Sequence, residues 1–160
     1  MRSLRSPIRA LAIALASLGL AAVAGANPAA PVKVAAVKDL PEAVQKTVLA
    51  ESAGGKIRAM WKETAEDGKL IYEVEMLVKG MSKDINVGED GTVLVCEQQI
   101  TLAALPAKVR EAMLKAAGKR RITMVESVTK AGALAHYEMR VRDGKEIKEM
   151  EFSLDGAPMP

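Results

Sequence analysis

Apolar and polar residues alternate with a period of two along several short stretches of this chain. In residues 70–78 every second side chain is apolar, and residues 135–142 alternate in the same way. This period is typical of β-strands that bury one face of a sheet. Turn sequences at residues 66–68, 88–91 and 143–144 predict antiparallel hairpins between such strands.

Two other stretches have the period of an amphipathic helix. The first begins at Pro41 and ends at Gly54-Gly55, and the second begins at Pro106 and ends at Gly118. Proline is tolerated in the first turn of a helix, and glycine is frequent just beyond the last turn. The predicted inward-facing residues are Val44, Val48 and Leu49 in the first helix, and Val109, Met113 and Leu114 in the second.

The chain also matches itself at an offset of 65 residues without a gap. Eleven identities fall within the 54 residues from 38 to 91, among them the pair Leu40-Pro41 with Leu105-Pro106. The identities fall at turn, cap and core positions. We therefore expect them to define the architecture of the protein rather than a reaction.

Together these patterns predict an α+β protein built from two tandem repeats, each with one helix packed on an antiparallel sheet of three or four strands. The first repeat spans residues 39–100 and includes an additional apolar strand at residues 92–96, and the second spans residues 101–157. A unit of about 55 residues buries only ~60% of its unfolded surface and is marginally stable alone. The two repeats should therefore pack together.

The N-terminal residues have the features of a secretory signal peptide. Three arginines precede an uninterrupted small and apolar run at residues 10–22, and a small-x-small cleavage motif ends at Ala26. The run is shorter than the ~20 residues that a membrane-spanning helix needs. We predict a signal peptide at residues 1–26, a flexible leader at residues 27–38, and a periplasmic or secreted protein that has no membrane attachment after cleavage.

Removal of the signal peptide changes the charge of the protein. The formal net charge of +3 comes from its three arginines, and the remaining chain has 20 basic and 20 acidic residues. Without excess positive charge, neither a nucleic acid nor an anionic membrane is an expected partner. The single cysteine, Cys96, excludes an intramolecular disulfide, and its apolar surroundings favour a buried, unreactive thiol over an intermolecular bridge.

Few residues are candidates for catalysis or metal binding. His136 is the only histidine, and it is expected to be solvated on the polar face of its strand. Glu73 and Glu138 are expected to make cross-strand contacts on the same exposed face. Residues 84–91 space oxygen ligands like a calcium loop but lack the glycine and the distal glutamate of an EF-hand, so a hairpin is expected. Several methionines align with valine or isoleucine, which favours core filling over metal handling. We predict no catalytic residue, no metal site and no cofactor.

Trp61, Ile71 and Leu77 are the candidates for a partner-binding surface. Trp61 aligns with Glu126, a residue type that is rarely buried without a partner, so this position should be exposed. Ile71 and Leu77 lie on the polar face of the next strand. Exposed aromatic and aliphatic side chains on an open sheet face are typical of binding surfaces. The alternative is that Trp61 covers a helix end or the junction between the repeats.

Several of these motifs resemble the PepSY-like family. The helix opening Leu40-Pro41-x-x-Val44, the segment at residues 71–75 (Ile-Tyr-Glu-Val-Glu) and the Asp90-Gly91 turn are similar to its members, and residues 101–157 resemble it more loosely. The family includes small exported bacterial proteins related in fold to the β-lactamase inhibitor protein. The resemblance implies a helix on an antiparallel sheet, often in tandem, without catalytic residues.

The resemblance also implies a class of function. PepSY domains occur in propeptides of thermolysin-type peptidases and in exported or membrane-anchored regulators, where they are thought to restrain peptidases or sense the cell envelope. We therefore expect an exported, non-enzymatic binding protein with a protein partner, and a peptidase is the partner that the family implies. The alternative is a periplasmic sensor of a small ligand or of a metal such as calcium.

Overall fold

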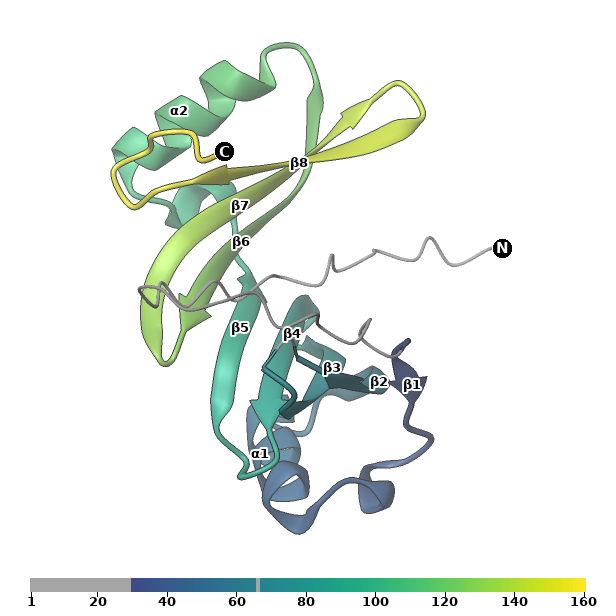
Figure 1. Ribbon diagram of the computed structural model, residues 1–160. Helices are drawn as coiled ribbons and strands as arrows, with labels where there is room; N and C mark the ends of the chain where they lie inside the picture. The colour runs from purple at the N-terminus through teal and green to yellow at the C-terminus, as the bar shows by residue number, and fades with distance from the viewer. Residues whose placement is uncertain (1–29, 66) are drawn as a thin grey trace.

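The computed structural model describes residues 30–65 and 67–160, and the predicted signal peptide lies outside these residues. The strands are hydrogen-bonded in sequence order from β1 to β8, each antiparallel to the next (Figure 1). Neither described α-helix is long and apolar enough to cross a membrane. The elements are β1 (Val32–Lys33), the 3-10 helix η1 (Val37–Asp39), α1 (Glu42–Ser52), β2 (Lys56–Thr64), β3 (Leu70–Val78), β4 (Met81–Gly88), β5 (Val93–Gln99), the 3-10 helix η2 (Leu102–Ala104), α2 (Ala107–Ala117), β6 (Arg121–Lys130), β7 (Ala133–Asp143) and β8 (Glu146–Phe152).

The prediction of two tandem helix-on-sheet repeats is wrong, because the strands of both halves join in one eight-stranded sheet. The junction is β5, where Cys96 is in register with Ile85 of β4 on one side and with Thr129 of β6 on the other. A strand at the edge of a separate sheet would present a row of unpaired backbone N–H and C=O groups. Pairing of β5 with β6 satisfies these groups and makes the sheet continuous.

Both α-helices pack on the same face of this sheet. Ile85, in the core beneath α1, is in register with Cys96, and Cys96 is in register with Thr129. Val125, in the core beneath α2, lies four residues before Thr129 on the same strand and therefore points to the same side. Figure 1 shows α1 and α2 at opposite ends of the molecule with the sheet between them.

The core consists of two clusters, one beneath each α-helix. The central apolar positions predicted in β3 and β7 are buried, and Val74, Met76 and Met139 are 0% exposed, whereas Leu70, Val78 and Ala135 are half-buried. Cys96 is a free, half-buried thiol against the first cluster, and burial raises its pKa. The buried residues are Leu40, Val44, Val48, Met60, Tyr72, Val74, Met76, Ile85 and Val87 in the first cluster, and Leu105, Val109, Met113, Ala117, Val125, Tyr137, Met139, Val141 and Phe152 in the second.

Two leucines that were predicted to face inward lie on the outside of the helices. Leu49 is 58% exposed and Leu114 is 47% exposed. Each follows directly after a fully buried residue, Val48 or Met113. Because successive helical residues are rotated by about 100°, the buried side takes residues four apart, and the next residue points away from the sheet.

The helices are held against the sheet by glycine turns. Pro41 and Pro106 precede the helices with φ of −56° and −52°, which suits a helix start. Gly91 and Gly156 both have positive φ, and a Cβ at Gly91 would lie 2.7 Å from the carbonyl oxygen of Ala43 in α1. Glycine is therefore required at this turn by its backbone conformation and by the approach of the helix.

Candidate functional site

The face of the sheet opposite the α-helices carries a row of carboxylates. Each of the six consecutive strands β3 to β8 places at least one acidic side chain on this face. Glu75 is the cross-strand partner of Asp84, Asp84 of Glu97, Glu126 of Glu138, and Glu138 of Glu151. Between β5 and β6 the row steps by one diagonal, since Gln99 and not Glu97 is opposite Glu126. We call Glu75, Asp84, Glu97, Glu126, Glu138 and Glu151 the acidic row.

This helix-free face is concave. Carboxylate oxygens of Asp84, Glu97 and Glu126 lie within 4.8 Å of one another, although β4 and β6 would be about 9–10 Å apart in a flat sheet. Glu126 is 1% exposed and Glu138 is 4% exposed, although no described helix covers them. A bend of the sheet toward this face is consistent with the convergence of the oxygens and with the burial of the side chains.

Burial makes these carboxyl groups hard to ionise. The pKa of Glu97 is raised to about 8, first by burial and then by the negative charges of Glu138 and Glu126. Burial also raises the pKa of Glu126 to about 7 and that of Asp84 to about 6. Nearby, burial and the adjacent Glu63 raise the pKa of Glu73 to about 8. The concave face therefore holds more acidic groups than it can easily keep charged.

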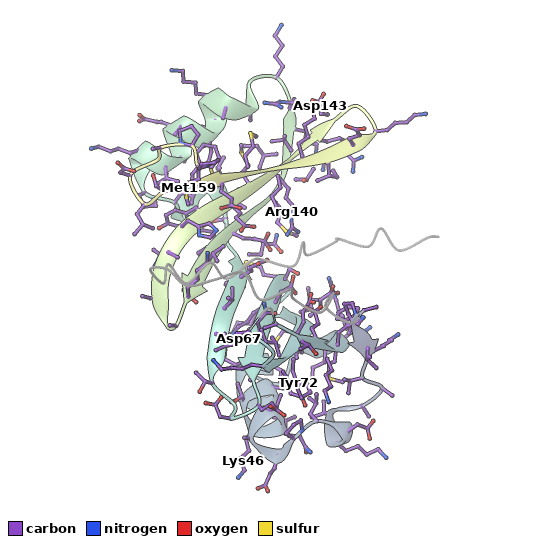
Figure 2. All side chains as sticks on the ribbon, viewed as in Figure 1. Lys46, Asp67, Tyr72, Arg140, Asp143 and Met159 are labelled. Atoms are coloured by element: carbon purple, nitrogen blue, oxygen red, sulfur yellow. The ribbon has the colours of Figure 1, made fainter. Side chains whose placement is uncertain are left out.

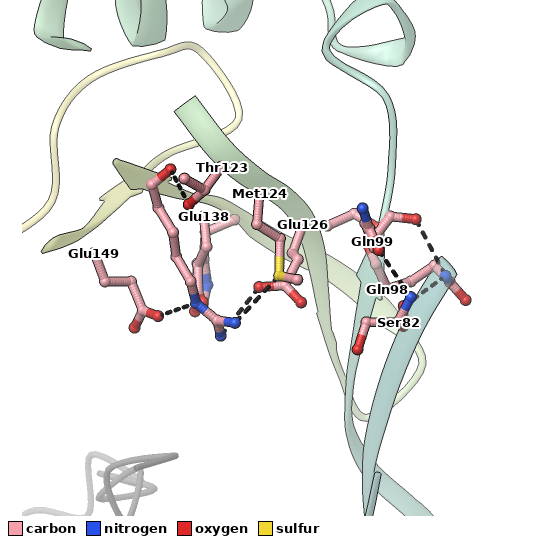
Figure 3. Close-up of polar contacts among 11 residues, drawn as sticks. Ser82, Gln98, Gln99, Thr123, Met124, Glu126, Glu138 and Glu149 are labelled. Carbon is pink, nitrogen blue, oxygen red and sulfur yellow. Dashed lines mark hydrogen bonds and ion pairs between the residues drawn. The ribbon is translucent and has the colours of Figure 1, made fainter. Parts of the chain in front are cut away.

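Arg140 of β7 supplies positive charge to this face (Figure 2). Its Nη2 lies 3.1 Å from Oε2 of Glu126, and its Nε donates a hydrogen bond of 2.7 Å to Oε2 of Glu149 (Figure 3). Its Nη1 also lies 3.1 Å from the sulfur of Met124. One guanidinium is thus shared between two carboxylates at one side of the row, and Asp84 and Glu97 are not among its direct contacts.

Three buried oxygens of the row accept no hydrogen bond from residues 30–65 and 67–160. They are Oδ1 of Asp84 and both carboxylate oxygens of Glu126. The 3.1 Å contact between Glu126 and Arg140 is an ion pair whose orientation does not meet hydrogen-bond geometry. An unsatisfied buried acceptor costs about 1–3 kcal/mol, and more when it is charged. These oxygens are therefore polar atoms whose burial is not compensated by a hydrogen bond from the described residues.

His136 is buried, which corrects the prediction of a solvated surface residue. It is 2% exposed, and its Nε2 lies 3.1 Å from Oε1 of Glu138 and 3.7 Å from Oε2 of Glu151. Glu73 and Glu138 are also buried, at 9% and 4% exposure, instead of standing on an exposed face. The alternation placed all three on the correct side of the sheet, but the concavity of that side removes them from solvent.

The predicted partner-binding residues Trp61, Ile71 and Leu77 are all half-buried. Trp61 is opposite Glu73, and Ile71 is opposite Glu63, so Trp61 and Ile71 are diagonal neighbours on the helix-free face. Leu77 lies six residues along β3 from Ile71, which is a distance of about 20 Å. The structure therefore brings Trp61 and Ile71 together and leaves Leu77 apart from them.

Trp61 also has a neighbour from the N-terminal segment. Lys33 of β1 is its cross-strand partner on the other side of β2. β1 lies within residues 27–38, the segment that the sequence analysis assigned to a flexible leader. Glu126, the residue aligned with Trp61, is nearly fully buried, so this alignment was a poor guide to the exposure of Trp61.

Residues 84–91 form the end of β4 and a hairpin turn, as expected from the sequence. Asp90 accepts hydrogen bonds of 2.9 Å from both the backbone N–H and the hydroxyl of Thr92. Asp84, in contrast, points from the strand to the helix-free face. Asp84 and Asp90 therefore lie in different surroundings, Asp84 on the helix-free face and Asp90 within the turn, and they do not form one calcium-binding loop.

The acidic row is the functional candidate that sequence reasoning missed. Its signal was present, because acidic residues occupy the polar positions of six successive predicted strands. The same pattern is produced by an ordinary solvated face. Only the pairing of β5 with β6 and the curvature of the sheet distinguish a buried carboxylate cluster from scattered surface charge.

Comparison with known proteins relates this chain to others by its fold. No family model matches the sequence, and no curated protein matches it. Solved structures of Bacteroides proteins do match. A candidate periplasmic protein from Bacteroides eggerthii has a TM-score of 0.62 and 15% identity, over 76% of this chain and 86% of that chain.

Two further solved structures have the same relationship to this chain. A DUF2874 family protein from Bacteroides ovatus has a TM-score of 0.56 and 15% identity, over 76% of this chain and 85% of that chain. A BLIP-like protein from Bacteroides fragilis has a TM-score of 0.53 and 16% identity, over 76% of this chain and 84% of that chain. The protein therefore has a BLIP-like fold, and at these identities the likeness concerns the fold alone.

Proposed function

We propose that this protein is an exported, non-enzymatic BLIP-like binding protein that holds a protein partner on its concave, helix-free face. The observation that carries the proposal is that both α-helices pack on one side of the sheet and leave the other side open and lined with buried acidic groups. A face of this kind has the curvature to receive a convex protein surface and the charge to select it.

The chemistry of the face favours a partner with basic residues at the centre of its contact surface. The acidic row would attract lysine or arginine side chains, which pair with carboxylates. Trp61 and Ile71, half-buried at one side of the row, would supply apolar contact area. The PepSY-like motifs suggest a peptidase as the class of partner. We include in the proposal that this protein is related to the PepSY-like family.

The same proposal includes the location of the protein. Cleavage near Ala26 would release it into the periplasm or the medium. The fold likeness to a candidate periplasmic protein from Bacteroides eggerthii supports this location. Binding rather than catalysis is favoured by the burial of His136, the only histidine, which is 2% exposed.

The alternative function, a periplasmic sensor of calcium or of a small ligand, loses its original basis in the segment at residues 84–91. Asp90 uses its oxygens within the turn, as described above. The carboxylates of the acidic row are a different candidate for a cation site, at another place on the chain.

Site-specific cross-linking tests the proposed interface. The full chain, expressed with its own N-terminus and purified after export, would carry a photo-reactive residue at Trp61 or, in a matched variant, at Leu114 on the helix side. We expect a protein of the producing cell to be captured from Trp61 and not from Leu114. The captured protein is then purified, assayed for peptidase activity, and titrated with the wild type and with Trp61→Ala and Leu114→Ala.

The expected result is a loss of affinity of tenfold or more in Trp61→Ala, since buried aromatic anchors dominate interface energies. Leu114→Ala, which shortens an equally apolar side chain on the opposite face, should bind as the wild type does. Capture through Leu114, or equal affinities of wild type and Trp61→Ala, would place the interface elsewhere.

A further inference from the structure

Three side chains from three different strands converge at the middle of the acidic row. Asp84 comes from β4, Glu97 from β5 and Glu126 from β6. One oxygen of each lies within 4.8 Å of the others. Oxygens bound to one Ca²⁺ at 2.3–2.6 Å can be at most roughly 5 Å apart, so the three oxygens are already within the span of a single coordination sphere.

A second observation, independent of this clustering, points to a missing ligand. Glu126 is 1% exposed, and neither of its oxygens accepts a hydrogen bond within the described part of the chain. Oδ1 of Asp84, whose carboxylate belongs to the same cluster, is also buried and accepts no hydrogen bond from the described residues. Buried carboxylates in proteins are nearly always paired, hydrogen-bonded or bound to a metal. Here, in the part of the chain that the structure describes, Glu126 has an ion pair with Arg140 but no hydrogen bond, and Oδ1 of Asp84 has no hydrogen bond.

The charges around the three carboxylates leave the site negative. Arg140 contacts Glu126 from one side, but it also binds Glu149. The pKa of Glu97 is raised first by burial and then by the negative charges of Glu138, Glu126 and Asp84, and the opposing effect of Arg140 is smaller. A divalent cation between the three carboxylates would remove this repulsion.

The neighbouring cluster of His136, Glu138 and Glu151 is a weaker candidate. Its three ligand atoms are also within 4.8 Å of one another. However, Nε2 of His136 lies at hydrogen-bond distance from Glu138, so histidine and carboxylate satisfy each other. No atom of this second cluster is among the buried polar atoms without a partner.

We propose that Asp84, Glu97 and Glu126 form a binding site for one hard divalent cation, with Ca²⁺ as the preferred ion. Carboxylate oxygens are the ligands of hard cations. Ca²⁺ accepts irregular geometry and more than three ligands, which suits side chains whose positions are fixed by three strands, with water completing the shell. The site shares carboxylates with the face assigned to the partner, but its evidence does not depend on that partner, and it would stand if that proposal failed.

The position of the site gives it a structural effect. β4 belongs to the part of the sheet beneath α1, and β6 to the part beneath α2. A cation bound to both strands across β5 would link the two core clusters on the concave side. We expect it to stabilise the curvature of the sheet as well as the three side chains.

Thermal unfolding and calorimetric titration of the exported full chain test the proposal. After treatment with a chelator, the protein is titrated at pH 7.5 with CaCl₂, MgCl₂ or MnCl₂ in separate experiments. We expect about one Ca²⁺ per chain and a rise in Tm of roughly 5 °C at a tenfold excess over the dissociation constant, because a ligand of the folded state stabilises it by mass action.

The variants Asp84→Asn and Glu126→Gln keep the shape of the side chains and remove their charges. Both should lose the Ca²⁺-dependent rise in Tm, and circular dichroism in the presence of the chelator shows whether they are folded. Glu151→Gln in the neighbouring cluster and Glu111→Gln on the exposed side of α2 should retain it.

Three results would overturn the site. The first is a Tm that none of the three cations changes. The second is an equal rise in the wild type and in Glu126→Gln, which would indicate adventitious binding to surface carboxylates. The third is a rise that Glu151→Gln removes and Asp84→Asn keeps, which would assign the ion to the neighbouring cluster. Since none of these measurements includes a partner protein, they are independent of the interface test.

Discussion

Asp84 of β4 and Glu97 of β5 are direct cross-strand partners on the concave face of the sheet. Like charges directly opposite one another destabilise a sheet, and here burial makes the charged forms still less favourable, which raises both pKa values. Glu126 and Glu138 repeat the arrangement between β6 and β7. Such an arrangement lowers the stability of the folded protein. We therefore infer that the acidic face serves binding and not folding.

We expect the stability of the protein to fall as the pH rises from about 4.5 to about 8, and Glu73→Gln to reduce this fall. Burial raises the pKa of Glu73 from 4.5 to about 8. Below pH 4.5 the carboxyl is protonated in both states. Between the two values the unfolded chain releases the proton while the folded protein keeps it, so a rise in pH favours unfolding.

Urea unfolding at pH 5 and pH 8 measures this effect. Glu111→Gln, which changes an exposed glutamate of α2 in the same way, is the matched control and should follow the wild type. A Glu73→Gln variant whose loss of stability between the two pH values equals that of the wild type would contradict the assignment.

Replacement of Arg140 by methionine should destabilise the protein by about 3–5 kcal/mol, because it leaves Glu126 buried without its charge partner. Adding Glu126→Gln to Arg140→Met should recover part of this loss, since the uncompensated charge is then removed. Arg142→Met, at an exposed position two residues along the same strand, is the control. Additive effects of the two changes at residues 140 and 126 would show that the pair does not interact.

Met139→Ala should lower the stability of the whole sheet and not of one half alone. Met139 is 0% exposed beneath α2, and loss of a buried methionine side chain costs about 2–5 kcal/mol. Trp61, the only tryptophan, lies in β2 at the other end of the sheet. Because the strands are continuous, the unfolding midpoint followed by Trp61 fluorescence should decrease in this variant.

The exposed Leu114 offers the control for that experiment, as Leu114→Ala should change the free energy of unfolding by no more than about 0.5 kcal/mol. If Met139→Ala left the Trp61 transition where it is in the wild type, the two halves would unfold independently.

Gly91→Ala should destabilise the protein more than Gly80→Ala. Both glycines have positive φ, which costs other residues about 1–2 kcal/mol. At Gly91 a Cβ would also meet the carbonyl oxygen of Ala43 at 2.7 Å, whereas Gly80 has open space. We expect losses of about 3 kcal/mol and about 1 kcal/mol, respectively, in chemical unfolding. Equal losses would mean that α1 can move away from the turn at little cost.

Local patterns predicted the elements of this fold well. The prolines at 41 and 106 and the alternation in β3 and β7 placed helices and strands correctly, because these signals depend on backbone geometry within a few residues. The helix stripe was less well placed: Leu49 and Leu114 are adjacent to buried residues, yet they lie on the exposed side.

The joining of the two halves could not be predicted in the same way. Matches at an offset of 65 residues suggested two separate sheets, but the edge of β5 is a generic hydrogen-bonding surface that any strand could pair. That β6 takes this place is decided by the packing of the complete chain. The burial of His136, Glu73 and Glu138 was missed for the same reason, since it results from curvature across several strands.

The sequence by itself determined which residues alternate, where helices begin, and which side of each strand carries acidic groups. It could do so because propensity, turn chemistry and side-chain period act over short distances along the chain. Only the tertiary structure decided that Asp84, Glu97 and Glu126 share one buried point. Their convergence depends on the register of β4, β5 and β6 and on the bend of the whole sheet, and such long-range pairings are set by the packing of both cores together.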